Sequence, residues 1–163
     1  MAGRGLGRHG PGYDVGSWRY NEGRHGSMSS FTSPLFVEEI GGGNWRIAQE
    51  FDYAVGTEDS GIVIGVPAGF VTDFASIPQV LWNILPPVGK YGKAAVIHDY
   101  LYCSGGRVIT VPQAGRALKL YYSREQCDDI FREAMEVLGV GRIKRNLMWL
   151  AVRAFGGPSF KAA

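Results

Sequence analysis

The chain has 163 residues, of which 45% are hydrophobic and 20% are charged, and its formal net charge is +2. This length suits one core of ordinary size, so we expect a single domain with appendages. The small net charge gives no argument for nucleic acid as a partner, and no apolar run approaches the roughly 20 residues that cross a bilayer. Cys103 and Cys127 are too few for a disulfide framework, and the N-terminus lacks the apolar core of a signal peptide. We therefore expect a protein made in a cytoplasm.

Residues 1–30 are rich in glycine and arginine and have neither a helical nor a strand period. This composition predicts a flexible arm, followed by one domain over residues 31–163. The arm also contains Tyr13, Trp18 and Tyr20. Because aromatic side chains among glycine and arginine can order on a partner surface, an unstructured tail and a docking arm both stay open.

Three strands are predicted in the first half of the domain, over residues 35–40, 45–55 and 62–71. The segments between them, GGGN and TEDSG, have the composition of turns. From Trp45 to Tyr53 apolar and polar residues largely alternate, which indicates a half-buried antiparallel strand. Together the three segments predict a small antiparallel β-meander.

The second half of the chain has helical periods. Ser76 and Gln79 form a capping-box pattern that predicts a short helix beginning at Ile77. A second helix is expected within residues 89–106, and the two consecutive glycines at its end are typical of a helix stop.

The clearest helix follows Ser123, which forms a second capping box with Gln126 and is closed by Gly139. The last helix is expected within residues 141–157. It has apolar residues on one side, basic residues elsewhere and no acidic residue: Ile143, Leu147, Leu150, Ala151 and Ala154, against Arg142, Lys144, Arg145 and Arg153. Strands followed by helices predict an α+β fold, with an N-terminal antiparallel β-meander followed by three to four packed helices.

His98 and Asp99 lie side by side in the apolar and aromatic run AAVIHDYLY, and both are expected at the edge of one apolar stripe. A partly buried imidazole or carboxylate needs polar partners. Asp128 is the predicted partner of His98, because it should lie at the rim of the buried face of the Ser123 helix. A carboxylate on Nδ1 would leave Nε2 free as a general base, and Asp99 would be available for a hard cation such as Ca²⁺, for Zn²⁺, or for a backbone cap.

Asp73 and Ser76 form a weaker cluster in the segment GFVTDFASIP. Together with His98 they would complete a Ser-His-Asp set, although no nucleophile-elbow pattern surrounds Ser76 and the capping box already accounts for its hydroxyl. Asp73 has three open interpretations: a turn residue, a hydrogen-bond partner of the His98 helix, or a metal ligand.

Three motifs occur in order: GFVTDFASIP, then HDYLY, then DDIFREAM. From Leu35 to Gly156 the chain resembles a phage and prophage family of unknown function with the patterns GF-x-TDFASIP, HD-x-LY and D-x-x-F-x-x-AM. Cys127 stands where that family usually has a small residue. The resemblance implies a phage origin, often among structural or lysis-region genes, and implies no established activity.

A weaker local similarity links HD-x-x-Y, followed on a later helix by CD-x-x-F, to the helix pair of phospholipase A2. This similarity implies that His98 is a general base to water, that Asp99 binds Ca²⁺, and that Asp128 orients the imidazole. The glycine-rich calcium loop of that family is missing upstream of His98, and Cys103 is displaced from the family's cysteine. A lipid substrate is therefore much less supported than the histidine chemistry.

Two functions follow. The first is a phage virion protein, associated with the tail or connector, whose arm and basic last helix contact other virion proteins and whose polar residues form a buried network. The alternative is a metal-assisted hydrolase that acts on cell-envelope material, with His98 as general base. We do not expect nucleic acid as a partner, because the domain lacks a recognition motif.

Overall fold

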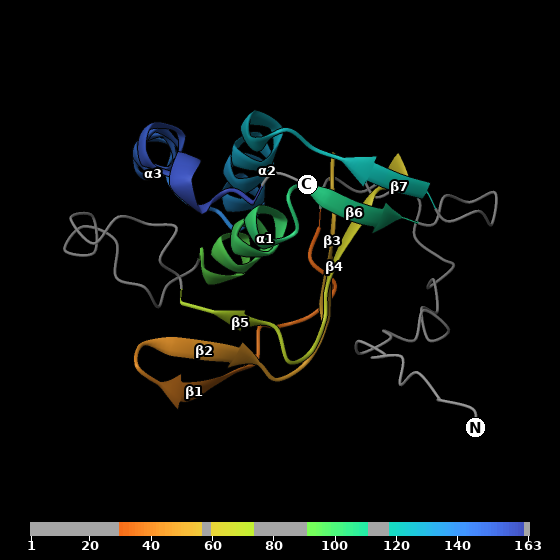
Figure 1. Cartoon of the computed structure of the whole chain (residues 1–163). Helices are drawn as coiled ribbons and strands as arrows, with labels where there is room; N and C mark the ends of the chain where they lie inside the picture. Colours follow the sequence, from red (N-terminus) through yellow and green to blue (C-terminus); the bar gives the residue numbers. More distant parts are fainter. Residues whose placement is uncertain (1–29, 57–59, 74–90, 111–117, 162–163) are drawn as a thin grey trace, which may run out of the picture.

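The computed structural model describes residues 30–56, 60–73, 91–110 and 118–161. These residues form an antiparallel β-region in the first half of the chain and packed helices in the second, so the α+β prediction is confirmed (Figure 1). The elements are β1 (Val37–Gly41), β2 (Asn44–Ile47), β3 (Phe51–Ala54), β4 (Val63–Val66), β5 (Val71–Thr72), α1 (Gly92–Cys103), β6 (Arg107–Thr110), β7 (Leu118–Tyr121), α2 (Arg124–Val137), α3 (Arg142–Phe155) and the short 3-10 helix η4 (Gly157–Ser159). The predicted arm and the predicted helix at Ile77 lie outside the described residues.

The strands pair antiparallel in three small sheets, β1-β2-β5, β3-β4 and β6-β7. Two of the predicted strands are therefore wrong in extent. The segment 45–55 is divided into β2 and β3 by three exposed residues, 48–50, and the segment 62–71 is divided into β4 and β5. The alternating pattern identified the strands but not the break between them.

The break has a local cause at Pro67 and Gly69. Proline cannot donate to a strand ladder, and Gly69 has a φ of +86°, which favours glycine. The Gly69 N–H donates to the carbonyl of Ile47 (2.7 Å), and the Ile47 N–H donates to the carbonyl of Phe70 (2.8 Å). The two predicted strands therefore bend next to each other and pass between the β1-β2-β5 sheet and the β3-β4 sheet, as the bend between β2/β5 and β3/β4 in Figure 1 shows.

The β6–β7 ribbon, with four residues in each strand, was not predicted. It follows α1 directly, and its first turn depends on Gly106. A Cβ atom there would lie 1.9 Å from the Tyr122 carbonyl oxygen, and the φ of +74° also favours glycine. The predicted helix stop at Gly105 and Gly106 is confirmed, and the same glycine lets the chain turn back into a strand.

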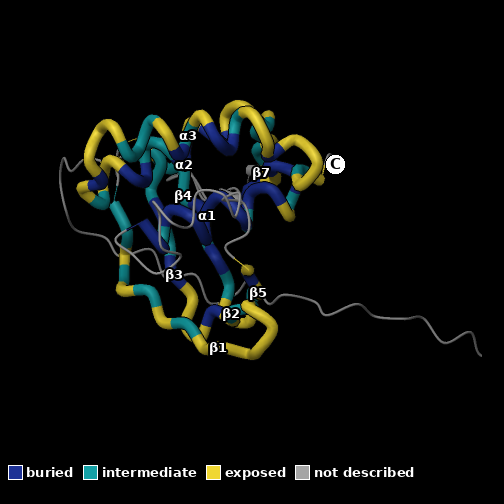
Figure 2. The backbone as a smooth tube through the Cα atoms, turned by 90° about the vertical axis from the view of Figure 1, so that its left-hand side faces the viewer, coloured by how far each residue is buried: buried dark blue, intermediate teal, exposed yellow. Residues whose placement is uncertain are grey.

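The helix α1 is buried on nearly every side (Figure 2). It contacts β4 and β5 on one side and α2 on the other. Its apolar residues join the core with Tyr53 and Ile64 of the strands and with Phe131 and Met135 of α2. A helix in this position offers little solvent to its side chains, so polar residues on its buried sides, such as His98 and Asp99, must find partners inside.

The helix α2 begins and ends as predicted. The Gln126 N–H donates to Ser123 Oγ (3.3 Å), and the Ser123 N–H donates to Gln126 Oε1 (2.8 Å), which completes the capping box. Gly139 follows the C-cap with a φ of +71°.

The helix α3 packs on α2 through Met148, Ala151 and Val152. Of the apolar side predicted from the sequence, only Ala151 is buried. After α3, the chain returns to α1 through η4, where the Lys161 N–H donates to the carbonyl of Tyr102 (3.1 Å). Among the described helices, none has the length and apolar character that spanning a bilayer requires.

Candidate functional site

The side chains of His98 and Asp128 meet between α1 and α2. His98 Nε2 lies 2.9 Å from Asp128 Oδ1, and the Tyr102 hydroxyl donates to the same oxygen at 2.5 Å. Because a carboxylate only accepts, Nε2 is the nitrogen that carries the proton in this pair. The sequence therefore identified the correct partner for His98, although Asp128 is fully buried and not at a rim.

The prediction that Asp128 contacts Nδ1 of His98 is wrong. Asp128 contacts Nε2, whereas Nδ1 is buried and has no hydrogen-bond partner among the described residues. The reason is the direction from which α2 approaches. The nitrogen farther from Cβ, Nε2, faces the carboxylate, and the nearer nitrogen, Nδ1, does not. The ring packs against Tyr102 and Phe131, at centroid distances of 4.1 and 4.8 Å.

The second oxygen of Asp128 faces two arginines. Arg153 Nη1 of α3 lies 3.5 Å from Oδ2, and Arg124 Nη1, one turn earlier on α2, lies 3.8 Å away. Arg124 also donates to the Arg153 carbonyl (3.1 Å). Asp128 therefore joins α1, α2 and α3 through one carboxylate.

This environment determines the charge of Asp128. Burial alone raises its pKa, but the hydrogen bonds from His98 and Tyr102, together with the charges of His98 and Arg124, outweigh burial and hold the pKa below its usual range. Burial and the nearby Asp128 carboxylate raise the pKa of the Tyr102 hydroxyl, which keeps it a donor. The network thus holds an ionised carboxylate that is fully enclosed by protein.

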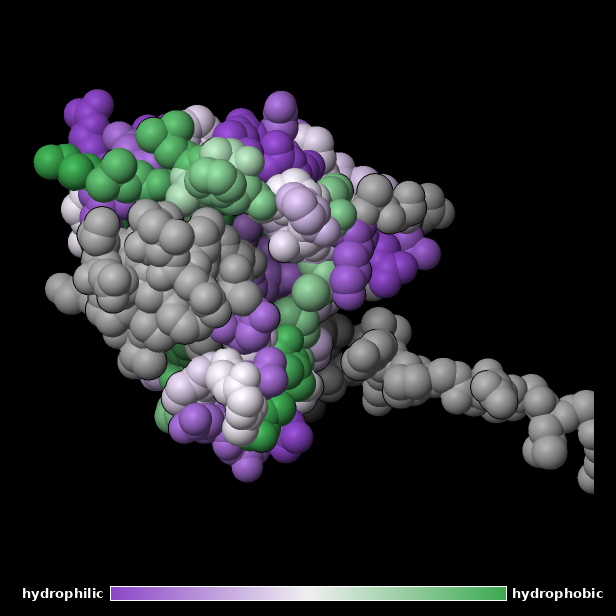
Figure 3. Space-filling model, turned by 60° about the vertical axis from the view of Figure 1, so that its left-hand side comes forward, coloured by the Kyte–Doolittle hydropathy of each residue, from purple (hydrophilic) through white to green (hydrophobic). Residues whose placement is uncertain are grey.

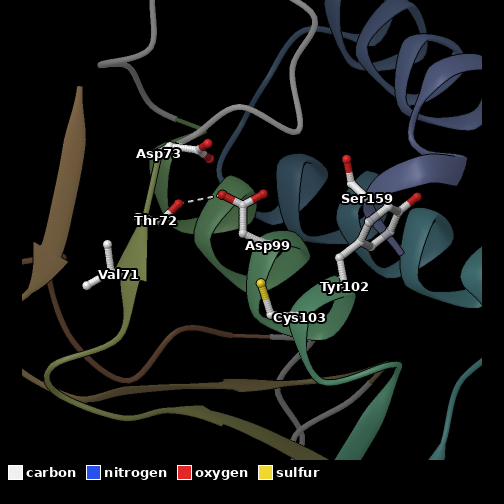
Figure 4. A pocket seen from close by; sticks show the side chains of 7 residues that line it. All are labelled: Val71, Thr72, Asp73, Asp99, Tyr102, Cys103 and Ser159. Carbon is white, nitrogen blue, oxygen red and sulfur yellow. Dashed lines mark hydrogen bonds between the residues drawn. The ribbon is translucent and has the colours of Figure 1, made fainter. Parts of the chain in front are cut away.

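Asp99 lies on another side of α1 and takes part in a different contact. The Thr72 hydroxyl of β5 donates to Asp99 Oδ2, and both side chains are buried. They line a pocket of about 190 Å³ that also includes Asp73, Tyr102 and Cys103 (Figure 4). Figure 4 shows the Asp73 and Asp99 carboxylates on the same side of the pocket, with Tyr102 and Ser159 opposite.

The pocket and the network share Tyr102, but His98 does not line the pocket. Burial raises the pKa of the Cys103 thiol at its edge, which keeps the thiol protonated at neutral pH. The described lining of the pocket supplies two carboxylates and the hydroxyls of Thr72, Tyr102 and Ser159 as oxygen donors. Within the described ranges, no group of three or more His, Cys, Asp or Glu side chains gathers around a point that could hold a metal.

The family model described as "Protein of unknown function (DUF1353)" matches residues 45–152. The chain belongs to this family. The matched region contains most of β2, all of β3 to β7, α1, α2 and most of α3, and therefore His98, Asp99 and Asp128 of this DUF1353 member. Arg153, which closes the network from α3, lies just beyond it.

A similar protein is the "Uncharacterized protein y4jT" of Sinorhizobium fredii (strain NBRC 101917 / NGR234), which is 35% identical over 77 residues. The match covers 46% of this DUF1353 chain and 22% of that protein, so the chain spans less than a quarter of the relative's length. No solved structure matches the chain.

The remaining site predictions for this DUF1353 chain have different outcomes. Ser76 lies outside the described residues. Asp73 is exposed at the end of β5 and faces the pocket. Tyr102, Arg124 and Arg153 were not predicted as partners of Asp128. Tyr102 is four residues after His98 and Arg124 is four before Asp128, so helical spacing could have identified both. For Arg153, on a separate helix, no such signal exists.

Proposed function

We propose that this chain is a structural or assembly protein of a phage virion, associated with the tail or connector, and that the His98–Asp128 network fixes the packing of its helices. The observation that carries the proposal is the enclosure of the network: His98 and Asp128 are both 0% exposed. A general base has to reach a proton of its substrate, directly or through one water. A pair closed off from solvent supports a role in packing.

The phage assignment is supported by the order and spacing of the GFVTDFASIP, HDYLY and DDIFREAM motifs. The site of action would be the virion, after synthesis in the bacterial host cytoplasm. In this role the contacts with other virion proteins come from the arm and from α3, which carries four basic residues and no acidic one.

Mass spectrometry of purified phage particles tests the virion role. The particles come from the host that encodes the chain, and the control particles come from the same host with the gene deleted. Copies of the chain in a fixed ratio to the major virion proteins support the proposal. Particles that contain no copies, while the chain is detected in the host lysate, overturn it.

A second candidate function is a metal-assisted hydrolase that acts on cell-envelope material, with His98 as general base and Asp128 as its orienting group. The pocket favours this candidate, because it places the Asp73 and Asp99 carboxylates together and is connected to the network through Tyr102. Catalysis would require His98 to become accessible from the pocket, since the ring is fully buried.

Thermal unfolding with EDTA, Ca²⁺, Mg²⁺ or Zn²⁺ tests this candidate, because a ligand that binds only the folded state raises the unfolding midpoint. The matched variants are Asp99→Asn in the pocket and Asp129→Asn on the exposed side of α2. A cation-dependent rise that is lost only in Asp99→Asn supports the hydrolase. An equal midpoint in all four conditions contradicts a cation site.

A further inference from the structure

The surface of α3 carries a row of apolar side chains that the described part of the chain leaves exposed. Ile143 is 80% exposed, Leu147 49% and Leu150 54%, and Ala154 is also exposed. Figure 3 shows the apolar surface over α3, in green, next to hydrophilic groups. We call these four residues the α3 seam. A contiguous exposed apolar row on a surface helix marks a contact site for another molecule.

The shape of the α3 seam indicates what that molecule is. The intervals between its residues are four, three and four, so at about 100° per residue the four positions fall within about 60° of the helix circumference. Such a narrow row is typical of a coiled-coil seam, which receives another helix. A helix that lies in a membrane surface has a broader apolar face.

The side chains next to the α3 seam also disfavour a membrane. The Trp149 indole faces α2, where its N–H donates to Asp129 Oδ1 (3.0 Å). Arg145 pairs with Glu136 (3.1 Å), and Arg153 faces Asp128. These aromatic and basic groups are occupied within the protein, and anionic lipid would need them free.

The α3 seam is complementary to itself. Its intervals read the same in both directions, so a two-fold axis between Leu147 and Leu150 would place two copies of α3 antiparallel in register. Leu147 of one copy would then face Leu150 of the other, and the large Ile143 would face the small Ala154. This arrangement is the isologous contact of a two-fold dimer.

Charge at the edge of the α3 seam favours the same arrangement. Arg142 is exposed at the beginning of α3. Antiparallel pairing brings it to the other end of the second copy's α3, near Arg153. Asp129 lies there, exposed, 3.9 Å from Arg153 Nη2. At about 100° per residue Arg142 points about 110° away from the centre of the row, so its pair with Asp129 of the other copy would lie at the rim of the contact, where such pairs fix orientation more than affinity.

We propose that this protein self-associates as a two-fold dimer through the α3 seam, with the two α3 helices antiparallel. The inference goes beyond the virion role, since the pairing needs only copies of this chain. A contact between two helices of this length buries less than the roughly 800 Å² per partner of a standard interface, so we expect the dimer to dissociate on dilution.

Sedimentation equilibrium of the full chain over roughly 1 to 100 µM tests the proposal. The seam variant is Leu147→Ser with Leu150→Ser. The matched control is Phe155→Ser, which is 69% exposed on the same helix but lies off the seam. We expect wild type and Phe155→Ser to form dimers, and the seam variant to dissociate at least tenfold more readily. Its thermal midpoint should match that of wild type at a concentration where both are monomeric. A wild type that stays monomeric throughout, or a seam variant that dimerises like wild type, overturns the proposal.

The orientation is tested by cysteine cross-linking in a Cys103→Ser background, because Cys103 is exposed. Ile143→Cys and Ala154→Cys are purified separately, then mixed and oxidised. Antiparallel pairing predicts a disulfide-linked heterodimer in the mixture and little linkage in either variant alone. Linkage of Ile143→Cys to itself indicates parallel helices and overturns the two-fold arrangement. A dimer in solution combined with particles that lack the chain would contradict only the virion role.

Discussion

The helices α1 and α3 distribute polar and apolar side chains in opposite ways. α1 carries two buried polar side chains, His98 and Asp99, and packs against a third, Asp128 of α2. α3 leaves Ile143 and Leu147 in solvent and buries only one narrow side. Both helices are rich in apolar residues, so composition does not account for the difference.

Position in the fold accounts for it. α1 lies between the strands and α2 and is covered on nearly every side, so its polar groups are enclosed and have to be paired. α3 lies on the outside of α2, which is its main neighbour among the described elements. The comparison teaches that polar residues in the covered helix have to find partners inside the protein, whereas apolar residues in the outer helix remain exposed to solvent.

The largest expected effect comes from removing the shared carboxylate of the network. Asp128→Ala leaves His98, Tyr102 and two arginines without their common acceptor, and breaking a buried ion pair from one side costs about 3–5 kcal/mol. Urea unfolding followed by circular dichroism measures the loss. The control is Asp129→Ala, the adjacent exposed carboxylate, for which we expect a loss of about 1 kcal/mol or less. Equal losses in the two variants would contradict a stabilising network.

The second-largest effect is expected at Met148 of α3, in comparison with its exposed neighbour Leu147. Met148 is 1% exposed and Leu147 49% exposed. We expect Met148→Ala to lower the free energy of unfolding by about 2–5 kcal/mol, because it leaves a cavity against α2. Leu147→Ala should change it by about 0.5 kcal/mol or less in the monomer. The measurement is urea unfolding at a concentration below the dimer range, and a reversed order would mean that α3 packs through its other side.

His98→Ala separates the two interpretations of the network at α1. If the imidazole holds the helices together, its loss destabilises the protein by about 1–3 kcal/mol, since the buried Asp128 loses a donor. If the site evolved for catalysis, the variant keeps its stability or gains some, because active sites often store unfavourable polar groups. Thermal unfolding of His98→Ala beside wild type decides between these outcomes.

The smallest effect is expected from protonation of Asp128. Its pKa is lowered in the folded state, so its contribution to stability is present above the unfolded-state pKa of about 3.9 and is lost as the pH falls through the folded-state value. The free energy of unfolding of wild type should therefore fall on acidification below about pH 4. In Asp128→Asn this part of the fall should be missing, whereas the control variant Asp129→Asn should keep it. Parallel pH curves for wild type and Asp128→Asn would contradict the lowered pKa.

Features that depend on neighbours in the sequence were predictable. The capping box of Ser123 and Gln126 and the stop at Gly139 involve residues within one or two turns, so their pattern alone defined α2. Helical spacing also identified Asp128 as the partner of His98. The α+β class followed from strands preceding helices, although the breaks in the long strands and the β6–β7 ribbon did not.

The sequence by itself therefore determined the ends of α2 and the strand character of the first half, because these rest on hydrogen bonds and periods within a few residues. The helical periods of α1 and α2 also indicated which aspartate would pair with His98. Only the tertiary structure decided that Asp128 contacts Nε2, that Arg153 joins it from a third helix, and that the apolar row of α3 faces outward. Each of these depends on the direction from which another element packs, and packing directions are fixed by the whole core and not by local sequence.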